Sequence, residues 1–205
     1  MSSDALPFSF SALLLAGGKS SRMGQDKAGL ILEGKTLWRR QLDLLRELGA
    51  EEILVSQKSD GPCVDSRCKI VIDDPPSRGP LSGICAGLKG CSTEWLLVLA
   101  VDMPRMTPEF LRKLVSLAGH EQQGIVPKCA GRLHPLAAIY PRRCSKVAEE
   151  CLRSDDWSMY QLVCRAGELS LVKEHEFSQE EKSLFANLNT PEDMRRFDRD
   201  TGCQP

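Results

Sequence analysis

Short apolar runs alternate with longer amphipathic segments along the first 120 residues. Each run is too short for a helix and is bounded by polar or turn residues, which is typical of buried strands. The runs are 10–15, 52–56, 69–72 and 95–101. Leucines at helical spacing predict a helix over 36–48, and prolines open two further helices at 80–89 and 108–117. This alternation predicts an α/β fold with a mostly parallel sheet, in which 95–101 is a central strand.

The second half of the chain is less regular. Its pattern predicts strands at 124–127 and 136–140, a helix at 142–152, an edge strand at 169–172 and a terminal helix at 191–197. There is no internal repeat and no convincing linker. The 205 residues therefore predict a single domain, 1–205.

A glycine-rich loop follows the first predicted strand. Gly17 and Gly18 are adjacent, and three cations follow within nine positions: Lys19, Arg22 and Lys27. Glycines let the backbone approach a phosphate closely, and cations balance its charge. Ligands of open α/β sheets bind at the carboxyl ends of strands, where this loop begins. We expect phosphate binding here; the alternative is an ordinary strand-to-helix turn with solvated cations.

Carboxylates follow two of the predicted strands. Asp102 ends the apolar run 95–101 and precedes Met103 and Pro104. A carboxylate oxygen at this edge of the sheet suits Mg²⁺ held together with substrate phosphates, although an Asp can also simply cap a turn. Asp73 and Asp74 end the preceding strand. One of them is predicted to contact the nucleotide or the metal, or else both are solvated.

Three further segments are candidates for ligand contact. Residues 77–83 form a second glycine-containing turn into a helix, and Arg132 and His134 lie beside a predicted strand. Asn187 and Asn189 are predicted to place two amides on one face of a short strand, before Thr190 caps the last helix. The alternatives are a tight strand-to-helix turn for 77–83 and a structural hydrogen-bonded role for His134.

Composition and charge narrow the choice of partners. The formal net charge is −1, which does not favour binding to nucleic acid or to a membrane surface. No apolar run approaches the ~18 residues needed to span a bilayer, and Asp4 is the only charge before Lys19, which is unlike an export signal. We therefore expect a cytoplasmic protein. The nine cysteines include no C-x-x-C pair, and Cys85, Cys151 and Cys164 are expected to pack as small apolar residues.

Five motifs occur in one consistent order. They are 15–27 (LAGGKSSRMGQDK), 79–83 (GPLSG), 102–104 (DMP), 132–135 (RLHP) and 187–192 (NLNTPE). Together they resemble the molybdenum cofactor guanylyltransferase family (MobA), whose members carry L-A-G-G-x-S-x-R-M-G-x-D-K in the first loop. One residue departs from the family pattern: Ser56 stands where the family often has an asparagine that is thought to contact guanine.

The resemblance implies a GT-A-like, Rossmann-like nucleotidyltransferase with three α/β/α layers. It implies Mg²⁺-dependent transfer of GMP from GTP to the terminal phosphate of molybdopterin or Mo-molybdopterin, with release of pyrophosphate. Residues from about 10 to 120 would bind the nucleotide, and those from about 121 to 200 the acceptor. Other molybdenum cofactor biosynthesis proteins and molybdoenzymes would be further partners. The alternatives are CTP or another phosphorylated acceptor, a non-catalytic GTP-binding protein, and a glycosyltransferase.

The resemblance also implies a role for each candidate residue. The catalytic residues would be Arg22, Lys27 and Asp102, with Asp102 as the metal ligand. The nucleotide would be bound by Leu15, Ala16, Gly17 and Gly18, chiefly through backbone N–H groups, and by Lys27, Ser56, Asp74 and Asp102. The acceptor would be bound by Arg132, His134, Asn187 and Asn189.

Overall fold

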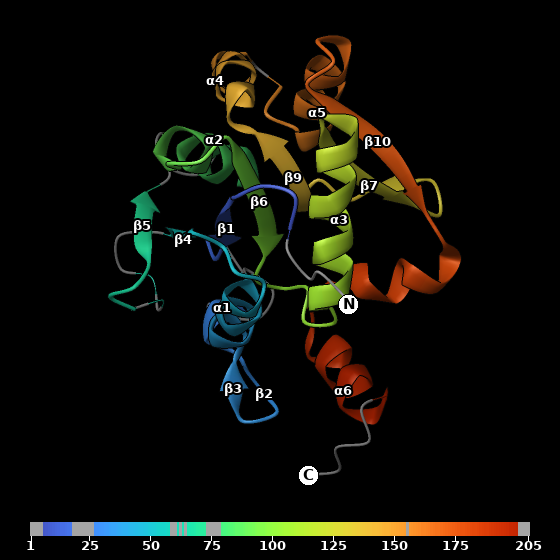
Figure 1. Ribbon diagram of the computed structural model, residues 1–205. Helices are drawn as coiled ribbons and strands as arrows, with labels where there is room; N and C mark the ends of the chain where they lie inside the picture. The colour runs from blue at the N-terminus through green and yellow to red at the C-terminus, as the bar shows by residue number, and fades with distance from the viewer. Residues whose placement is uncertain are drawn as a thin grey trace, which may run out of the picture.

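A central sheet lies between two layers of helices (Figure 1). The computed structural model describes residues 6–17, 27–57, 61, 63, 65–72, 79–154 and 156–200, without the side chains of 191, 196 and 198–200. The strands are β1 (Ser11–Leu15), β2 (Ile31–Leu32), β3 (Lys35–Thr36), β4 (Glu52–Gln57), β5 (Lys69–Ile72), β6 (Trp95–Ala100), β7 (Gly124–Cys129), β8 (Arg132–Leu133), β9 (Ala137–Pro141) and β10 (Val172–Phe177). The α-helices are α1 (Leu37–Glu47), α2 (Pro80–Gly90), α3 (Pro108–Glu121), α4 (Ser145–Arg153), α5 (Met159–Glu168) and α6 (Pro191–Asp200). Three 3-10 helices, η1 (Lys27–Gly29), η2 (Arg142–Cys144) and η3 (Gln179–Phe185), complete the described elements.

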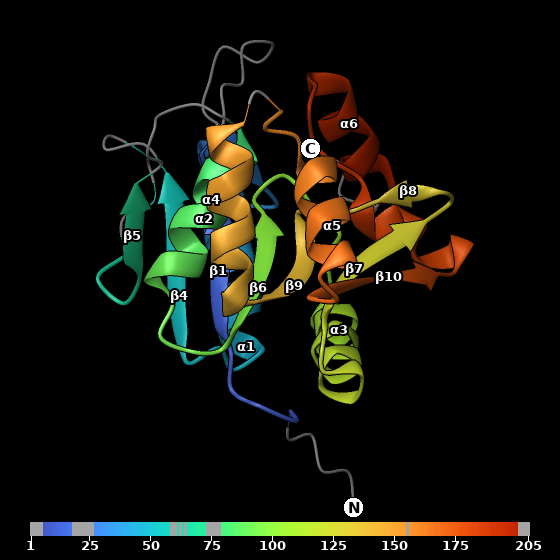
Figure 2. The same ribbon diagram turned by 90° about the horizontal axis from the view of Figure 1, so that it is seen from above.

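The main sheet has the strand order β10-β7-β9-β6-β1-β4-β5, and β8 pairs with β7. β1 pairs in parallel with both β4 and β6, and β10 pairs in parallel with β7. β9 is antiparallel to β6 on one side and to β7 on the other, so β7 and β10 run in the same direction as β6. The carboxyl ends of six strands therefore meet at one edge of the sheet, as the mostly parallel prediction requires. Figure 2 shows β5 on one side of the sheet and β7 and β10 on the other.

Alternate residues of the central strands supply the two cores. In β1, Ala12 and Leu14 face the core under α1 and α3, whereas Leu13 and Leu15 face the core under α2, α4 and α5. Both sets are buried because helices cover both faces, which is why the strand reads as a continuous apolar run. A Cβ at Gly87 would lie 2.6 Å from Leu13 Cδ2, so glycine lets α2 approach β1 closely. In Figure 2, α2 and α4 lie in front of the central strands.

After residue 155, one predicted strand is misplaced and one helix was not predicted. The edge strand exists, but it spans Val172–Phe177, and the expected 169–171 close the end of α5. Leu171 N donates to Ala166 O, and Ser170 has φ 55°. Helix α5 itself was not predicted, because only three of its residues are buried: Leu162, Val163 and Ala166. The polar strand β10 is formed by its pairing with β7 instead of by an apolar run of its own.

The cysteines of the described chain are free thiols. Cys85 and Cys151 are buried among apolar residues, as predicted, whereas Cys164 is partly exposed. Within the described residues, no helix is long and apolar enough to cross a membrane.

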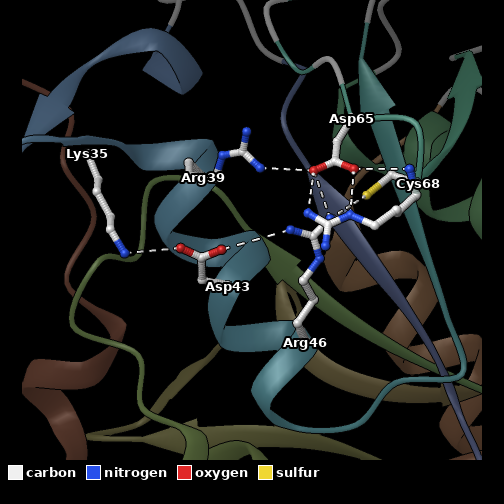
Figure 3. A network of polar contacts seen from close by, with 7 residues as sticks. Lys35, Arg39, Asp43, Arg46, Asp65 and Cys68 are labelled. Carbon is white, nitrogen blue, oxygen red and sulfur yellow. Dashed lines mark hydrogen bonds and ion pairs between the residues drawn. The ribbon is translucent and has the colours of Figure 1, made fainter.

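A carboxylate with three arginine partners fastens the segment between β4 and β5 to α1 (Figure 3). Asp65 Oδ2 lies 2.9 Å from Arg39 Nη1 and 2.8 Å from Arg46 Nη2. Its Oδ1 accepts hydrogen bonds from the backbone N–H and the Nε of Arg67. The side chain is only 8% exposed. The bonds from Arg67, followed by those from Arg46, hold the pKa of the Asp65 carboxyl well below its usual range.

We predict that Asp65→Asn destabilises the protein at pH 7 and that this difference becomes smaller in acid. A carboxyl with a depressed folded-state pKa stabilises the fold fully above its unfolded pKa of about 3.9, and this stabilisation is lost progressively as pH falls from that value through the folded-state pKa. Urea unfolding at pH 7 and at pH 3 measures the effect. The control is Asp43→Asn, because Asp43 pairs with Lys35 at 3.2 Å in an exposed position and should matter little. Equal effects of the two substitutions at pH 7 would contradict the prediction.

Candidate functional site

The ends of the central strands are tied together by backbone hydrogen bonds. Val101 N donates to Leu15 O at 3.1 Å, which joins the end of β6 to the end of β1. The N–H groups of Ala16 and Gly17 both donate to Ser56 O at 2.9 Å, which joins β1 to β4. These bonds determine where the chain leaves β1 toward the predicted phosphate loop.

Binding of a nucleotide by the N–H groups of Ala16 and Gly17 stays a prediction, and it requires these groups to exchange the Ser56 carbonyl for the ligand. A backbone N–H is a single donor, and both donors are already used within the protein. Their carbonyls and Cα atoms still lie at the edge of the sheet. Gly18 and Arg22, together with Lys19, Asp73 and Asp74, are outside the described residues.

Lys27, Asp102 and Asn189 meet at this edge although they are far apart in the sequence. Lys27 Nζ lies 2.8 Å from Asp102 Oδ2 and donates to Asn189 Oδ1 at 2.5 Å. The Lys27 and Asp102 side chains are 22% and 17% exposed, so the ion pair is partly shielded and still open to a ligand. The structure thus places a predicted nucleotide-binding cation against a predicted metal ligand and a predicted acceptor residue.

The turn that carries Asp102 is held from two directions. Gln41 of α1 donates its Nε2 to Met103 O at 2.7 Å, and the Gln41 side chain is buried. Leu188 N donates to Asp102 O at 2.8 Å from the segment before α6. Because both carbonyls are bonded to other parts of the chain, the Asp102 carboxylate has a well-defined position.

The side-chain oxygens of Asp102 and Asn189 are suitable ligands for a hard divalent cation. The Asp102 carboxylate and the Asn189 amide oxygen converge on one cation, the Lys27 ammonium. Mg²⁺ is commonly bound through one or two carboxylates plus substrate phosphates. One carboxylate and one amide oxygen therefore suffice as the protein ligands of such a site. No cluster of three His, Cys, Asp or Glu side chains that could hold a metal occurs among the residues the structure describes.

A cavity of about 900 Å³ opens beside Asn189. All four predicted acceptor residues line it: Arg132, His134, Asn187 and Asn189. Met103 and η3 complete parts of the wall. Residues 186–189 do not form the predicted strand, because they pair with no other strand. The two amides nevertheless face the cavity while Leu188 between them is buried in the core.

An aromatic stack forms one wall of this cavity. The His134 ring lies 3.9 Å from the Phe185 ring, centroid to centroid, with planes 14° apart. Burial, and to a smaller extent the Arg132 charge, lowers the pKa of His134 below its ordinary value. The imidazole is therefore neutral at pH 7.

The remaining predicted residues lie beneath the site or at its border. Ser56 is only 1% exposed, and a Cβ at Gly83 would lie 2.4 Å from its Oγ, so this hydroxyl is packed under α2. Because the Ser56 side chain is buried there, it has no open surface toward a base in this structure. The 77–83 turn does lead into a helix: Gly79 has φ 68° and precedes Pro80 at the first position of α2. Thr190 caps α6 as predicted, since its Oγ1 accepts from Asp193 N.

Three residues of the site were not predicted. Gln41 looks like a break in the apolar face of α1, and Phe185 follows a charged segment with no strand or helix signal. Asp193 was overlooked, although a Thr followed three residues later by an acidic residue is a known N-terminal signal of helices.

Comparison with known proteins covers most of the chain. Residues 12–168 match the family model of the MobA-like NTP transferase domain. The chain belongs to the MobA-like NTP transferase family. It is 37% identical over 186 residues to a probable molybdenum cofactor guanylyltransferase of Opitutus terrae, a match that covers 89% of this chain and 92% of that protein. A protein of the same name from a Geobacillus strain is 36% identical over 186 residues, and the match covers 89% of this chain and 94% of that protein.

The fold is shared with solved structures of the family. Molybdopterin-guanine dinucleotide biosynthesis protein A from Archaeoglobus fulgidus superimposes with a TM-score of 0.72 at 22% identity, covering 95% of this chain and all of that one. At this identity the likeness concerns the fold, and it agrees with the predicted nucleotidyltransferase architecture.

We predict that Gln41→Leu destabilises this MobA-like protein by about 0.5–1.5 kcal/mol, because the buried Met103 carbonyl loses its 2.7 Å bond from Gln41 and keeps only the 3.2 Å bond from Met106 N. Urea unfolding measures the change. The matched control is Gln123→Leu, since Gln123 donates to Ser170 O at a partly exposed position where water can replace it. A Gln41→Leu variant as stable as the control would show that the bond contributes little.

Proposed function

We propose that this protein transfers GMP from GTP to the terminal phosphate of molybdopterin or Mo-molybdopterin, which gives the guanine dinucleotide and pyrophosphate. The observation that carries the proposal is the contact of Lys27 with Asp102 and with Asn189. It joins the end of the predicted phosphate loop to the edge of a cavity large enough for a second substrate. The names of the related proteins support the same reaction.

The nucleotide is proposed to lie over the ends of β1, β4 and β6. Lys27 ends the loop that carries Gly18 and Arg22, and its ammonium lies at the end of β6 through Asp102. A phosphate oxygen of the nucleotide would replace the Asp102 carboxylate as the partner of Lys27. The roles of Gly18, Arg22 and Asp74, and the division into a nucleotide half and an acceptor half, stay predictions.

The chemistry is proposed to rest on positioning and charge. The acceptor phosphate attacks the α-phosphorus of GTP in line, the new P–O bond forms, and the bond to the pyrophosphate oxygen breaks. A phosphate nucleophile is already ionised near neutral pH, so no general base is needed. Lys27 and Arg22 stabilise charge on the phosphoryl group and on the leaving pyrophosphate.

We infer Mg²⁺ as the metal, held by Asp102 together with the nucleotide phosphates. When bound, it would supply Lewis-acid polarisation and a template for the phosphate oxygens. Asp102 is oriented for this by the bonds at its own carbonyl and at Met103, so its carboxylate needs little reorganisation.

The acceptor is proposed to occupy the cavity beside Asn189. Arg132 offers a cation for a phosphate, Asn187 and Asn189 offer amides, and the neutral His134 ring with Phe185 offers an aromatic wall. We also propose that the enzyme acts in the cytoplasm, which agrees with the free thiols of the described cysteines.

The choice of base is tested by calorimetric titration with GTP, CTP and ATP, each with Mg²⁺. We expect GTP to bind at least about tenfold more tightly than CTP, the size of one well-formed set of base hydrogen bonds. A preference for CTP would keep the fold and the chemistry but move the substrate to the cytidylyl alternative. Binding of no nucleotide would contradict the assignment of the glycine loop.

We predict that Lys27→Ala and Asp102→Asn each lower guanylyl transfer by about 10²-fold or more, the scale of losing one preorganised charged contact. Pyrophosphate release with GTP and molybdopterin measures the rate. The matched controls are Lys89→Ala and Glu149→Gln, which break another 2.8 Å Lys–carboxylate pair, between α2 and α4. Near-wild-type turnover of folded Lys27→Ala and Asp102→Asn would contradict both roles.

A further inference from the structure

The beginning of α6 contacts both sides of the proposed active site. Asn189 lines the cavity and also accepts a hydrogen bond from Lys27. Its neighbour Leu188 donates its N–H to Asp102 O at 2.8 Å. A segment of two residues thus touches the side chain of the proposed phosphate-binding lysine and the backbone of the proposed metal ligand.

The position of Asn189 depends on a carboxylate four residues later. The N–H groups of Asn189 and Thr190 both donate to Asp193 Oδ2 at 2.9 Å. In return, Asp193 N donates to Thr190 Oγ1 at 3.2 Å. This reciprocal arrangement satisfies backbone donors at the start of α6 and orients the peptide that carries the Asn189 side chain.

Helix α6 packs against the rest of the protein through Phe197, and this contact holds its first turn in place. Phe197 is buried, and the guanidinium carbons of Arg105 and Arg40 lie 5.0 Å and 5.8 Å from its ring centroid. Asp193 itself borders both the 900 Å³ cavity and a neighbouring cavity of about 280 Å³ that Phe197 also lines. The carboxylate therefore stands between the anchored part of α6 and the active site.

We propose that Asp193 is a positioning residue that holds the Asn189 amide against Lys27 and so places the Lys27 ammonium beside Asp102. The catalytic consequence rests on the proposed function, because it requires Lys27 to act on the phosphoryl group. The structural consequence is independent of the proposed function, because without Asp193 the Lys27 amine loses its fixed amide partner. Asp193 acts through its oxygen as an acceptor of two N–H groups, which makes an amide at this position a sufficient substitute.

The first readout is independent of activity. Reductive methylation of the intact protein, followed by mass spectrometry of the peptide that contains Lys27, measures how accessible this amine is. We expect Asp193→Ala to speed modification of Lys27 by about fivefold, the size expected from losing one helix cap. Asp193→Asn should stay within about twofold of wild type, because its Oδ1 can accept the same N–H groups. The control Asp156→Ala removes a carboxylate that accepts Ser158 N at 2.9 Å before α5, and it should leave Lys27 unchanged.

The second readout is a split between kcat and KM. We expect Asp193→Ala to lower kcat by about tenfold, as loss of an orienting partner does, while KM for GTP changes less than about twofold. In an Asn189→Ala background, Asp193→Ala should have no further effect, because the residue through which it acts is gone. Circular dichroism and urea unfolding confirm that each variant is folded.

Several results would overturn the proposal. Unchanged Lys27 modification in folded Asp193→Ala would do so, as would an Asp193→Asn variant as impaired as Asp193→Ala, since that assigns the effect to charge. If Asp193→Ala does not fold, Asn189→Ala alone should speed modification of Lys27 by about fivefold, and an unchanged rate would overturn the proposal. A wild-type protein that fails to transfer GMP would contradict the proposed function alone, and the modification rates would still test the positioning role.

Discussion

The turn at Asp102 and Met103 is the point on which the rest of the site depends. It follows the central strand β6, and its two carbonyls and its carboxylate are each bonded to a distant part of the chain. The Asp102 carbonyl accepts from Leu188, the Met103 carbonyl accepts from Gln41, and the Asp102 carboxylate pairs with Lys27. Unpaired carbonyls at this depth would cost free energy, so the same bonds that stabilise the turn also determine where the carboxylate stands.

Strand direction places the two candidate substrates side by side. β9 is inserted antiparallel between β6 and β7, which restores the direction of the following strands. The end of β7 and the β8 hairpin therefore project from the same edge of the sheet as the ends of β1, β4 and β6. A nucleotide over the ends of β1, β4 and β6 and an acceptor beside β7 and β8 would meet near Asp102, and Asn189 lies at that border.

The ion pairs of the chain differ in what they can contribute. Lys27 and Asp102 are shielded enough to interact strongly and open enough to exchange partners, which suits a site where a charged ligand must enter. Asp65 has three arginine partners, two of them on α1, so it holds the connection between β4 and β5 against that helix. Exposed pairs such as Lys89 and Glu149 contribute little to stability, because water competes for their charged groups.

Most of the fold could be read from the sequence, because buried parallel strands leave apolar runs and their helices leave spaced leucines. Two elements with little burial were missed or misplaced: α5, which has three buried residues, was not predicted, and the mostly polar edge strand β10 was placed at 169–172. For β10, pairing with β7 decides the structure, and no apolar run of its own predicts it. The motifs also pointed to Lys27, Asp102 and the residues of the cavity.

The sequence alone determined which residue types are present and which strand each one follows. Only the tertiary structure decided their contacts. It placed Lys27 against Asp102 and Asn189, and it used the N–H groups of Ala16 and Gly17 within the sheet. It also buried Ser56 under Gly83 and gave Gln41 and Asp193 their partners. The physical reason is that a hydrogen bond depends on distances of a few ångströms between segments up to 162 positions apart, and spacing along the chain does not encode those distances.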